Sequence, residues 1–147
     1  MMKNLNKYIF ALLALISLSF GQVSKGTKTI EGGLAISADD GDNVTMIDLS
    51  IGQFLTDNFL IEGAVEYLNN ADKSATSFAL AGSYFMNERT YASLGMIIPE
   101  EGDEELTVSL GMLSPFMMSE NVYLNPSLGY LTDSEIFTLT IGLRLFF

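Results

Sequence analysis

The feature that most constrains this chain is a regular alternation of apolar residues with small or polar ones, in segments of about ten residues. A period of two is typical of strands, whereas a helix needs apolar residues at every third or fourth position. No sustained helical period occurs after residue 21. We predict eight strands, at residues 27–37, 44–55, 58–67, 76–86, 91–98, 106–116, 122–131 and 136–147.

The connectors between these segments support the count of eight. Three are tight turns, at residues 56–58, 87–90 and 118–121, and four are longer or acidic, at 39–43, 68–75, 99–105 and 132–135. Phenylalanine also recurs at intervals of 31 residues, at Phe54, Phe85, Phe116 and Phe147. We interpret one repeat as a hairpin with its connector, so that four repeats make eight antiparallel strands.

The two faces of each predicted strand differ in composition. In the last segment one face holds only large apolar side chains, those of Phe137, Leu139, Ile141, Leu143, Leu145 and Phe147. The opposite faces hold Gly, Ala, Ser and Thr with isolated charges, which suits a narrow polar barrel interior rather than a solvated surface rich in Lys and Glu. The segment lengths agree with the about 9–11 residues of a tilted membrane strand. The pattern therefore predicts a transmembrane β-barrel.

The first 21 residues have a different character. Two lysines precede an unbroken apolar run of 13 residues at 8–20, with small residues at Ser19 and Gly21. This is the three-part pattern of a secretory signal peptide, and the run is shorter than the roughly 20 residues that a membrane-spanning helix needs. We predict a cleaved signal peptide over residues 1–21 and a single barrel domain over residues 22–147.

The predicted mature chain is strongly acidic and has no cysteine. It carries five basic side chains against 18 acidic ones, which is a net charge of −13. Such a surface does not favour nucleic acid, whose phosphates need Lys and Arg. An exported fold without disulfides needs another source of stability, and a closed barrel provides one through its continuous network of backbone hydrogen bonds.

Two stretches resemble a known family. Residues Ser50 to Gly63 (SIGQFLTDNFLIEG) resemble the first periplasmic hairpin of the small OmpX/OmpA-like outer-membrane barrels. The C-terminal TLTIGLRLFF ends in Phe147 after Leu145 and Leu143, and it is similar to the signal that the outer-membrane assembly machinery reads. The resemblance implies that the termini and tight turns lie in the periplasm and the acidic connectors outside. The family is functionally mixed, so it implies location in the outer membrane of a Gram-negative-type bacterium more than an activity.

The chain has no histidine, which limits the chemistry that it can perform. Ser–His, Asp–His and Cys–His pairs cannot be built, so carboxylates are the acids and bases left to weigh. Glu62 and Glu66 point the same way on one strand, about 13 Å apart by strand rise, which exceeds the carboxylate separations of glycoside hydrolysis. We predict that the chain is not an enzyme and has no catalytic, cofactor-binding or metal-binding residues.

The inward face carries charges that need partners. The alternation predicts five of them there: Glu31, Asp48, Glu62, Glu66 and Arg144. Buried charge must be paired or hydrated, and the first and last strands of a closed barrel are neighbours, so Glu31 and Arg144 are a natural pair. An eight-stranded barrel has room for side chains and little more. We predict a polar lumen filled by this charge network and trapped water, without an open pore.

Two acidic loops, at residues 39–43 and 100–105, offer oxygen ligands around a glycine. Neither has the ligand spacing of a dedicated calcium loop, and a glycine at a hairpin tip serves the turn itself. We favour solvated turns, and weak binding of divalent cations beside anionic lipopolysaccharide is a further hypothesis.

Together these patterns predict an all-β, eight-stranded antiparallel up-and-down transmembrane β-barrel preceded by a signal peptide. We expect a small integral outer-membrane protein with a structural or surface-interaction role, in contact with outer-membrane lipid, lipopolysaccharide and the assembly machinery. Two alternatives stay open: a narrow passive channel for ions or small solutes, and a soluble periplasmic lipocalin-like barrel that binds a lipid. A lipid carrier needs an apolar lumen, whereas the lumen predicted here is lined by small and polar side chains. The aliphatic outer band of this barrel would also promote aggregation in water.

Overall fold

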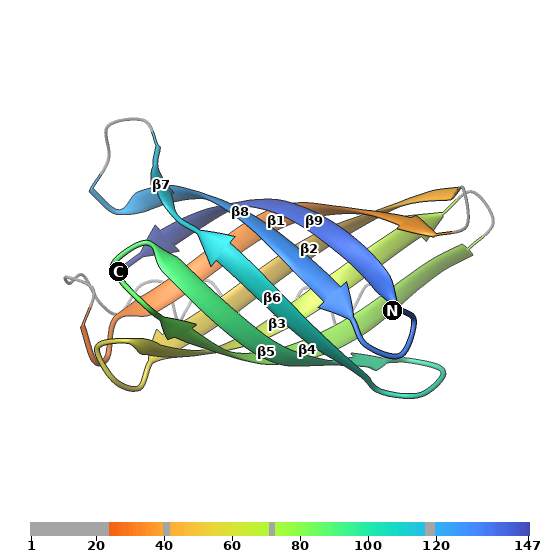
Figure 1. Cartoon of the computed structure of the whole chain (residues 1–147), viewed down its shortest axis with the longest axis horizontal. Helices are drawn as coiled ribbons and strands as arrows, with labels where there is room; N and C mark the ends of the chain where they lie inside the picture. The colour runs from red at the N-terminus through yellow and green to blue at the C-terminus, as the bar shows by residue number, and fades with distance from the viewer. Residues whose placement is uncertain (1–23, 40–41, 71–72, 117–119) are drawn as a thin grey trace, which may run out of the picture.

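The computed structural model describes residues 24–39, 42–70, 73–116 and 120–147, which form one antiparallel β-barrel (Figure 1). The predicted signal peptide and its cleavage site lie outside this part of the chain. Among the described residues no helix is long and apolar enough to cross a membrane. The strands are β1 (Lys28–Asp39), β2 (Asp42–Phe54), β3 (Phe59–Asn70), β4 (Lys73–Phe85), β5 (Thr90–Pro99), β6 (Glu105–Met112), β7 (Ser114–Pro115), β8 (Val122–Leu131) and β9 (Ile136–Phe146).

The hydrogen-bonded ladder closes on itself. Strands β1 to β6 pair in chain order, β1 pairs with β9, β9 with β8, and β8 with β6. The labels β6 and β7 mark two parts of one barrel strand, because both keep the same register to β8: Gly111 lies opposite Ser127, and Ser114 lies opposite Leu124. Between these partners β8 carries Pro126, which has no backbone N–H to donate, so the ladder is interrupted there. The predicted closed barrel of eight antiparallel strands is confirmed.

Two predicted connectors, 39–43 and 68–75, are wrong in length. The strands run through most of both stretches and pair out to Asp39, Asp42, Asn70 and Lys73. Ladder hydrogen bonds join backbone groups, so polar residues can continue a strand beyond its apolar band. The apolar alternation therefore marks the middle of these strands and not their ends.

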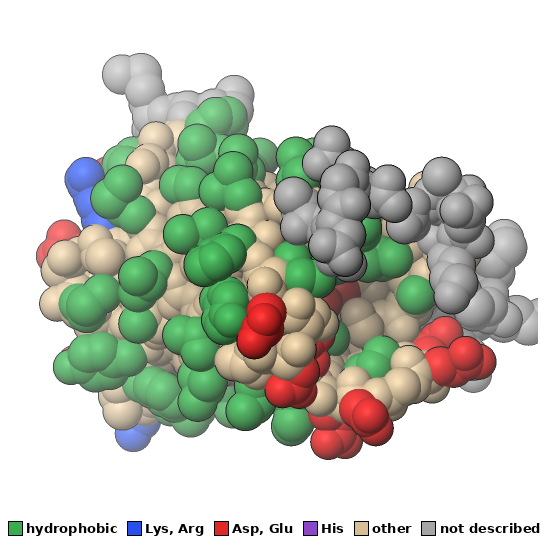
Figure 2. Space-filling view, turned by 45° about the vertical axis from the view of Figure 1, so that its right-hand side comes forward, with side chains coloured by type: hydrophobic (Ala, Val, Ile, Leu, Met, Phe, Trp, Pro, Cys, Tyr) green, Lys and Arg blue, Asp and Glu red, His purple; other side chains and the backbone are tan. Residues whose placement is uncertain are grey.

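The two faces of the barrel wall carry the side chains that the alternation predicts. The outer face is apolar, and Leu94 (59 %) and Phe137 (63 %) are among its most exposed side chains. Figure 2 shows hydrophobic side chains spread over the wall, with acidic ones gathered toward one end. On the inner face, Thr29, Ser83 and Asn125 are buried. This arrangement is the reverse of a water-soluble fold, in which large apolar side chains gather inside.

One end of the lumen is filled by a group of side chains that we call the basal cluster: Phe54, Leu60, Phe85, Tyr91, Leu113 and Phe146. Its rings pack closely, with centroids 5.2 Å apart for Phe54 and Phe85 and 5.0 Å apart for Phe85 and Tyr91. The predicted repeat of phenylalanines matches this cluster only in part, because Phe116 and Phe147 do not belong to it. Side chains alternate along a strand, so the inward position at the end of the chain is that of Phe146.

The tight turns at 56–58 and 87–90 lie at the same end of the barrel as the basal cluster and the C-terminus (Figure 1). Part of the third predicted tight turn, at 118–121, lies outside the described residues. The Asn87 side-chain oxygen accepts hydrogen bonds from the backbone N–H groups of Arg89 (2.9 Å) and Thr90 (2.8 Å), which is the geometry of an Asx turn. Asp57 accepts one from the backbone N–H of Lys25 at 3.0 Å. The Asn87 contacts fix the β4–β5 turn, and the Asp57 contact ties the segment before β1 to the β2–β3 turn.

Candidate functional site

A buried ion-pair network lies in the lumen around Arg144 of β9. Its Nε donates to Oε2 of Glu31, the residue opposite it on β1, and its Nη2 donates to Oε1 of Glu62 on β3 at 2.8 Å. The three side chains are at most 9 % exposed. The two residues that the sequence predicts to pair are in contact, and the structure adds Glu62 as a third. Arg144 thus links three strands through the interior of the barrel.

Two further polar residues complete this network. The Asn125 side-chain amide donates to both carboxylate oxygens of Glu31, at 3.0 and 2.8 Å, and its oxygen accepts from the Tyr91 hydroxyl at 2.9 Å. The Arg144 guanidinium carbon lies 5.4 Å from the centre of the Tyr91 ring, which is within cation–π range. Sequence reasoning missed both residues. An asparagine at an inward position in mid-strand was the available signal, because Asn is depleted in strands.

Glycines of neighbouring strands make room for the large lumen side chains. Four such side chains each lie over a glycine: Glu31 over Gly142, Asp48 over Gly33, Glu62 over Gly52 and Tyr91 over Gly111. A Cβ atom at any of these glycines would come closer than 3.0 Å to the side chain above it. The lumen therefore depends on the absence of side chains at these positions. Sequence reasoning missed these glycines too, because matching each one to its large neighbour needs the strand register.

The other two predicted lumen residues form no ion pair with Arg144 among the described residues. Asp48 and Glu66 lie opposite each other on β2 and β3. Glu66 accepts a long hydrogen bond of 3.3 Å from the Ser77 hydroxyl, and Oδ1 of Asp48 is buried without a hydrogen-bond partner among the described residues. The five predicted charges thus form two groups, an Arg144-centred triad and an acidic pair.

A cavity of about 170 Å³ runs along the lumen beside both groups. Its lining combines the five charged residues with small or hydroxyl side chains such as Ser93, Ser127 and Thr140. Within the described part of the chain, no group of three or more His, Cys, Asp or Glu residues could hold a metal ion. What the lining offers is a set of hydrogen-bonding groups with an excess of negative charge: four carboxylates against one guanidinium.

Comparisons with known proteins identify the fold. No family model and no curated protein matches this chain, but solved structures do. The N-terminal β-barrel domain of Pseudomonas aeruginosa OprF superposes with a TM-score of 0.68 at 17 % identity, over 84 % of this chain and 99 % of that one. The outer membrane protein Ail of Yersinia pestis gives 0.55 at 16 % identity, over 84 % of this chain and 100 % of that one. A de novo designed transmembrane β-barrel gives 0.64 at 16 % identity, over 87 % and 100 %. This chain has the fold of the small outer-membrane β-barrels.

In this outer-membrane barrel fold the chain ends at the seam where the first and last strands meet. The backbone N–H of Phe147 donates to the Lys28 carbonyl at 2.9 Å, and the Lys28 N–H donates to the Phe147 carbonyl at 2.8 Å. Of the predicted assembly-signal residues, Phe147 is 8 % exposed, Leu145 is half-buried, and Leu143 is 44 % exposed on the outer face. Phe147 therefore extends the pairing of β9 with β1 by one residue beyond Phe146.

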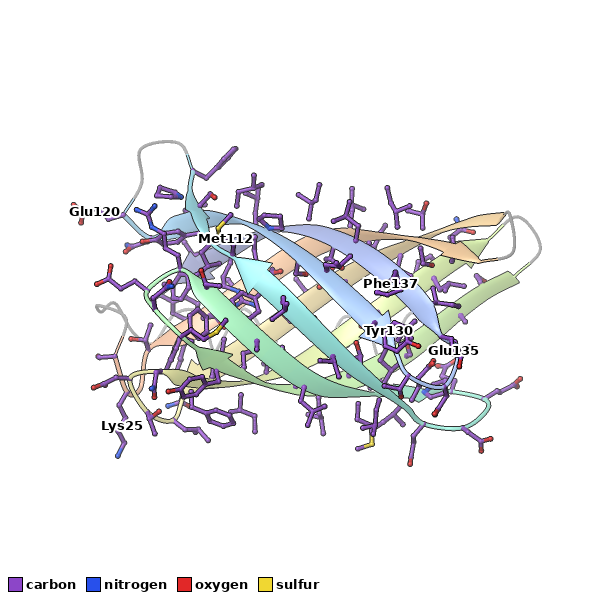
Figure 3. The ribbon with its side chains drawn as sticks, in the orientation of Figure 1. Lys25, Met112, Glu120, Tyr130, Glu135 and Phe137 are labelled. Carbon is purple, nitrogen blue, oxygen red and sulfur yellow. The ribbon has the colours of Figure 1, made fainter. Side chains whose placement is uncertain are left out.

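The end of the barrel opposite the C-terminus carries an acidic rim, which we define by the described residues Glu100, Glu101, Asp103, Glu104, Glu105, Asp133 and Glu135. Figure 3 shows Glu135 at this end and Lys25 at the opposite one. The backbone N–H of Ser134 donates to the Glu105 carboxylate at 2.6 Å, which joins the two loops of the rim. The acidic stretch at 39–43, one of the two loops that offer oxygen ligands around a glycine, includes residues outside the described part of the chain.

Proposed function

We propose that this chain is a small integral outer-membrane barrel with a structural or surface-interaction role, without catalysis and without an open pore. Its apolar outer wall supports a membrane location. A band of exposed aliphatic side chains would cause aggregation in water, whereas it is favourable in contact with lipid. The fold that it shares with outer-membrane barrels supports the same location.

The observation that carries the proposal of a closed pore is the filling of the lumen at two levels. The Arg144 bridge to Glu31 and Glu62 crosses the interior, and the basal cluster packs beyond it toward the tight turns. Opening the lumen would separate a buried guanidinium from two carboxylates, and uncompensated buried charge costs several kcal/mol. Trapped water in the remaining cavity is compatible with this role and does not require conduction.

A surface role would use the acidic rim. We infer that the rim faces the cell exterior, since the tight turns and the C-terminus occupy the other end, as the family resemblance implies. Its charge disfavours direct contact with anionic lipopolysaccharide, so divalent cations would have to bridge the two. The names of the structural neighbours do not choose between roles: one is a domain of OprF, and another is the attachment invasion locus protein of Yersinia pestis.

A second candidate, a narrow channel, is favoured by the lumen cavity of about 170 Å³. The third candidate, a soluble lipid carrier, is disfavoured by the polar lining of that cavity.

Outer-membrane lipid and the assembly machinery, which would read Phe147, Leu145 and Leu143, are the partners that our proposal requires.

Ion conductance of the refolded mature chain in a planar lipid bilayer tests the proposal. We expect a protein that inserts and stays silent, because the Arg144 bridge and the basal cluster obstruct the lumen. Stable, reproducible conductance steps would replace the proposal with the channel. A chain that is folded in water and does not insert would favour the soluble barrel.

A further inference from the structure

Part of the outer wall differs from the rest of the apolar band, because it is hollowed. A groove of about 290 Å³ lies there, lined by residues of β1 to β4 and by the end of the chain. Two of its aliphatic side chains, those of Ile61 and Leu80, are 45 % and 53 % exposed on the outer face. Lys28, Gln53 and Phe147 line it toward the tight turns. The groove therefore opens to the surroundings of the barrel and not to its lumen.

The strand register explains why the wall is hollow there. Ile51, Gly63 and Leu80 lie side by side in one row across β2, β3 and β4. Gly63 has the same orientation as Ile61, two residues before it, so it faces outward. Beyond the adjacent residues of the chain, a Cβ atom at Gly63 would have one described neighbour within 4 Å, Leu80 at 3.8 Å. The row therefore has an open position between two aliphatic side chains, which suits a hydrocarbon chain rather than a polar group.

The groove ends at a cation that has no ion pair within the described part of the chain. Lys28 and Gln53 lie opposite each other on β1 and β2, one outward position nearer the tight turns than Ile51. The half-buried Lys28 side chain forms no ion pair with a described residue. The terminal carboxylate of Phe147 accepts from the Lys28 backbone N–H at 2.8 Å, and it too forms no ion pair with the ammonium group. Ammonium and amide groups both donate hydrogen bonds, so this end of the groove is complementary to an oxyanion.

Neighbouring side chains mark the edge of the apolar band at about the same level. The Asn58 amide donates to the Tyr84 hydroxyl at 3.2 Å, where β3 and β4 meet the tight turn. Tyr84 is 52 % exposed and lies one outward position nearer the turns than Gly82, which shares a row with Lys28. Tyrosines with a hydrogen-bonded hydroxyl are typical of the membrane–water interface. In a membrane, Lys28 would therefore lie where lipid headgroups meet the acyl chains.

We propose that this groove binds a diacyl glycerophospholipid, with its phosphate at Lys28 and Gln53 and one acyl chain over Gly63. Such a lipid supplies both groups that the groove combines, an oxyanion at the polar end and a hydrocarbon chain along the apolar part. A free phosphate ion would leave the apolar part unfilled, and an uncharged lipid would leave the cation unpaired. The site rests on the membrane location proposed above, and in the orientation inferred there it belongs to the periplasmic leaflet.

Native mass spectrometry of the mature chain in an uncharged detergent tests the site. The two probes are phosphatidylglycerol and a diacylglycerol with the same acyl chains, which lacks the phosphate. We expect phosphatidylglycerol to bind about fivefold more tightly, which is the contribution of one lysine to the binding of anionic lipid. Equal affinities for the two lipids would overturn the proposal. A dimer that excludes lipid would assign the groove to a second copy of the chain and would also overturn it.

Variants at the two ends of the groove separate the two contributions. Lys28→Gln should lower the affinity for phosphatidylglycerol about fivefold and leave that for diacylglycerol unchanged. Gly63→Leu should weaken the binding of both lipids, because its side chain would occupy the position of the acyl chain. The matched controls, Lys25→Gln at an exposed lysine and Gly32→Leu at an exposed glycine of β1, should bind as the parent does. A loss of preference in Lys25→Gln but not in Lys28→Gln would place the phosphate outside the groove and contradict the proposal.

Insertion into phosphatidylcholine vesicles distinguishes a failure of this site from a failure of the membrane location. The parent and Lys28→Gln should both insert as folded barrels, so Lys28→Gln decides the test even if Gly63→Leu fails to fold. A parent that inserts without a preference for phosphatidylglycerol in detergent would contradict the lipid site alone. A parent that does not insert would contradict the membrane location and, with it, the site.

Discussion

At the scale of single residues, the lumen depends on one cation and on several missing side chains. Arg144 satisfies two carboxylates that would otherwise be buried without a counter-charge. The glycines beneath Glu31, Glu62 and Tyr91 provide the space in which these side chains lie. Charge and volume are therefore matched position by position in the interior.

Replacement of Arg144 by alanine should destabilise the barrel strongly. Removal of one partner of a buried ion pair typically costs about 3–5 kcal/mol, and here Glu31 and Glu62 would both lose the guanidinium. Urea unfolding of the refolded protein in lipid vesicles at neutral pH measures this change. Arg89→Ala, in an exposed turn, is the control and should change the free energy of unfolding by less than about 0.5 kcal/mol. Equal stability of Arg144→Ala and the parent would show that the network does not contribute to folding.

Gly111→Ala tests the matching of volume. The added methyl group would overlap the Tyr91 ring, and overpacking of this kind costs about 1–3 kcal/mol. Gly32→Ala is a matched control in β1, because no neighbouring atom lies within 4 Å of the position that its Cβ would occupy. The same unfolding measurement should separate the two variants. Similar effects at both glycines would mean that backbone flexibility, and not the contact with Tyr91, decides the result.

At the scale of elements, β9 has more than one role. It closes the barrel against β1, pairs with β8, and carries Arg144 on its inner face. The seam continues beyond the strand, because Phe147 and Lys28 exchange two backbone hydrogen bonds. The strand that resembles an assembly signal is thus also the strand whose pairing completes the fold.

Deletion of Phe147 should reduce the amount of folded barrel in the outer membrane severalfold. The deletion removes the terminal aromatic residue of the proposed assembly signal and both hydrogen bonds to Lys28. The folded fraction can be measured in membrane extracts by its heat-dependent electrophoretic mobility. Phe137→Ala, an exposed aromatic residue at the start of the same strand, is the control and should leave the folded fraction near that of the parent. A normal folded fraction after deletion of Phe147 would argue against a role of the C-terminal residue in assembly.

At the scale of the whole molecule, charge and packing differ between the two ends of the barrel. The described acids of the rim occupy the end opposite the tight turns, while Lys25 and the exposed Arg89 belong to the end with the tight turns. The basal cluster fills the lumen at that second end, and the cavity lies on the side of the rim. The lumen is therefore packed with side chains at one end and acidic at the other, which is the basis of the proposed function.

The sequence by itself determined the wall of this barrel. Alternation is a local property of a strand, so it predicted the number of strands, their antiparallel closure, and which residues face inward, including Glu31 and Arg144. The pairing of these two followed from closure, since it makes the first and last strands neighbours. The ends of β1 to β4 were not predictable in this way, because ladder hydrogen bonds continue where the apolar alternation stops.

Only the tertiary structure decided which side chains meet across the lumen. Arg144 contacts Glu62, which is 82 residues away and on a strand that does not pair with β9. Its ion pairs with described residues are to Glu31 and Glu62 and not to Asp48 or Glu66. That choice depends on the tilt and stagger of the strands and on the diameter of the closed barrel. These quantities belong to the assembled ring of strands, and no single strand carries a pattern that encodes them.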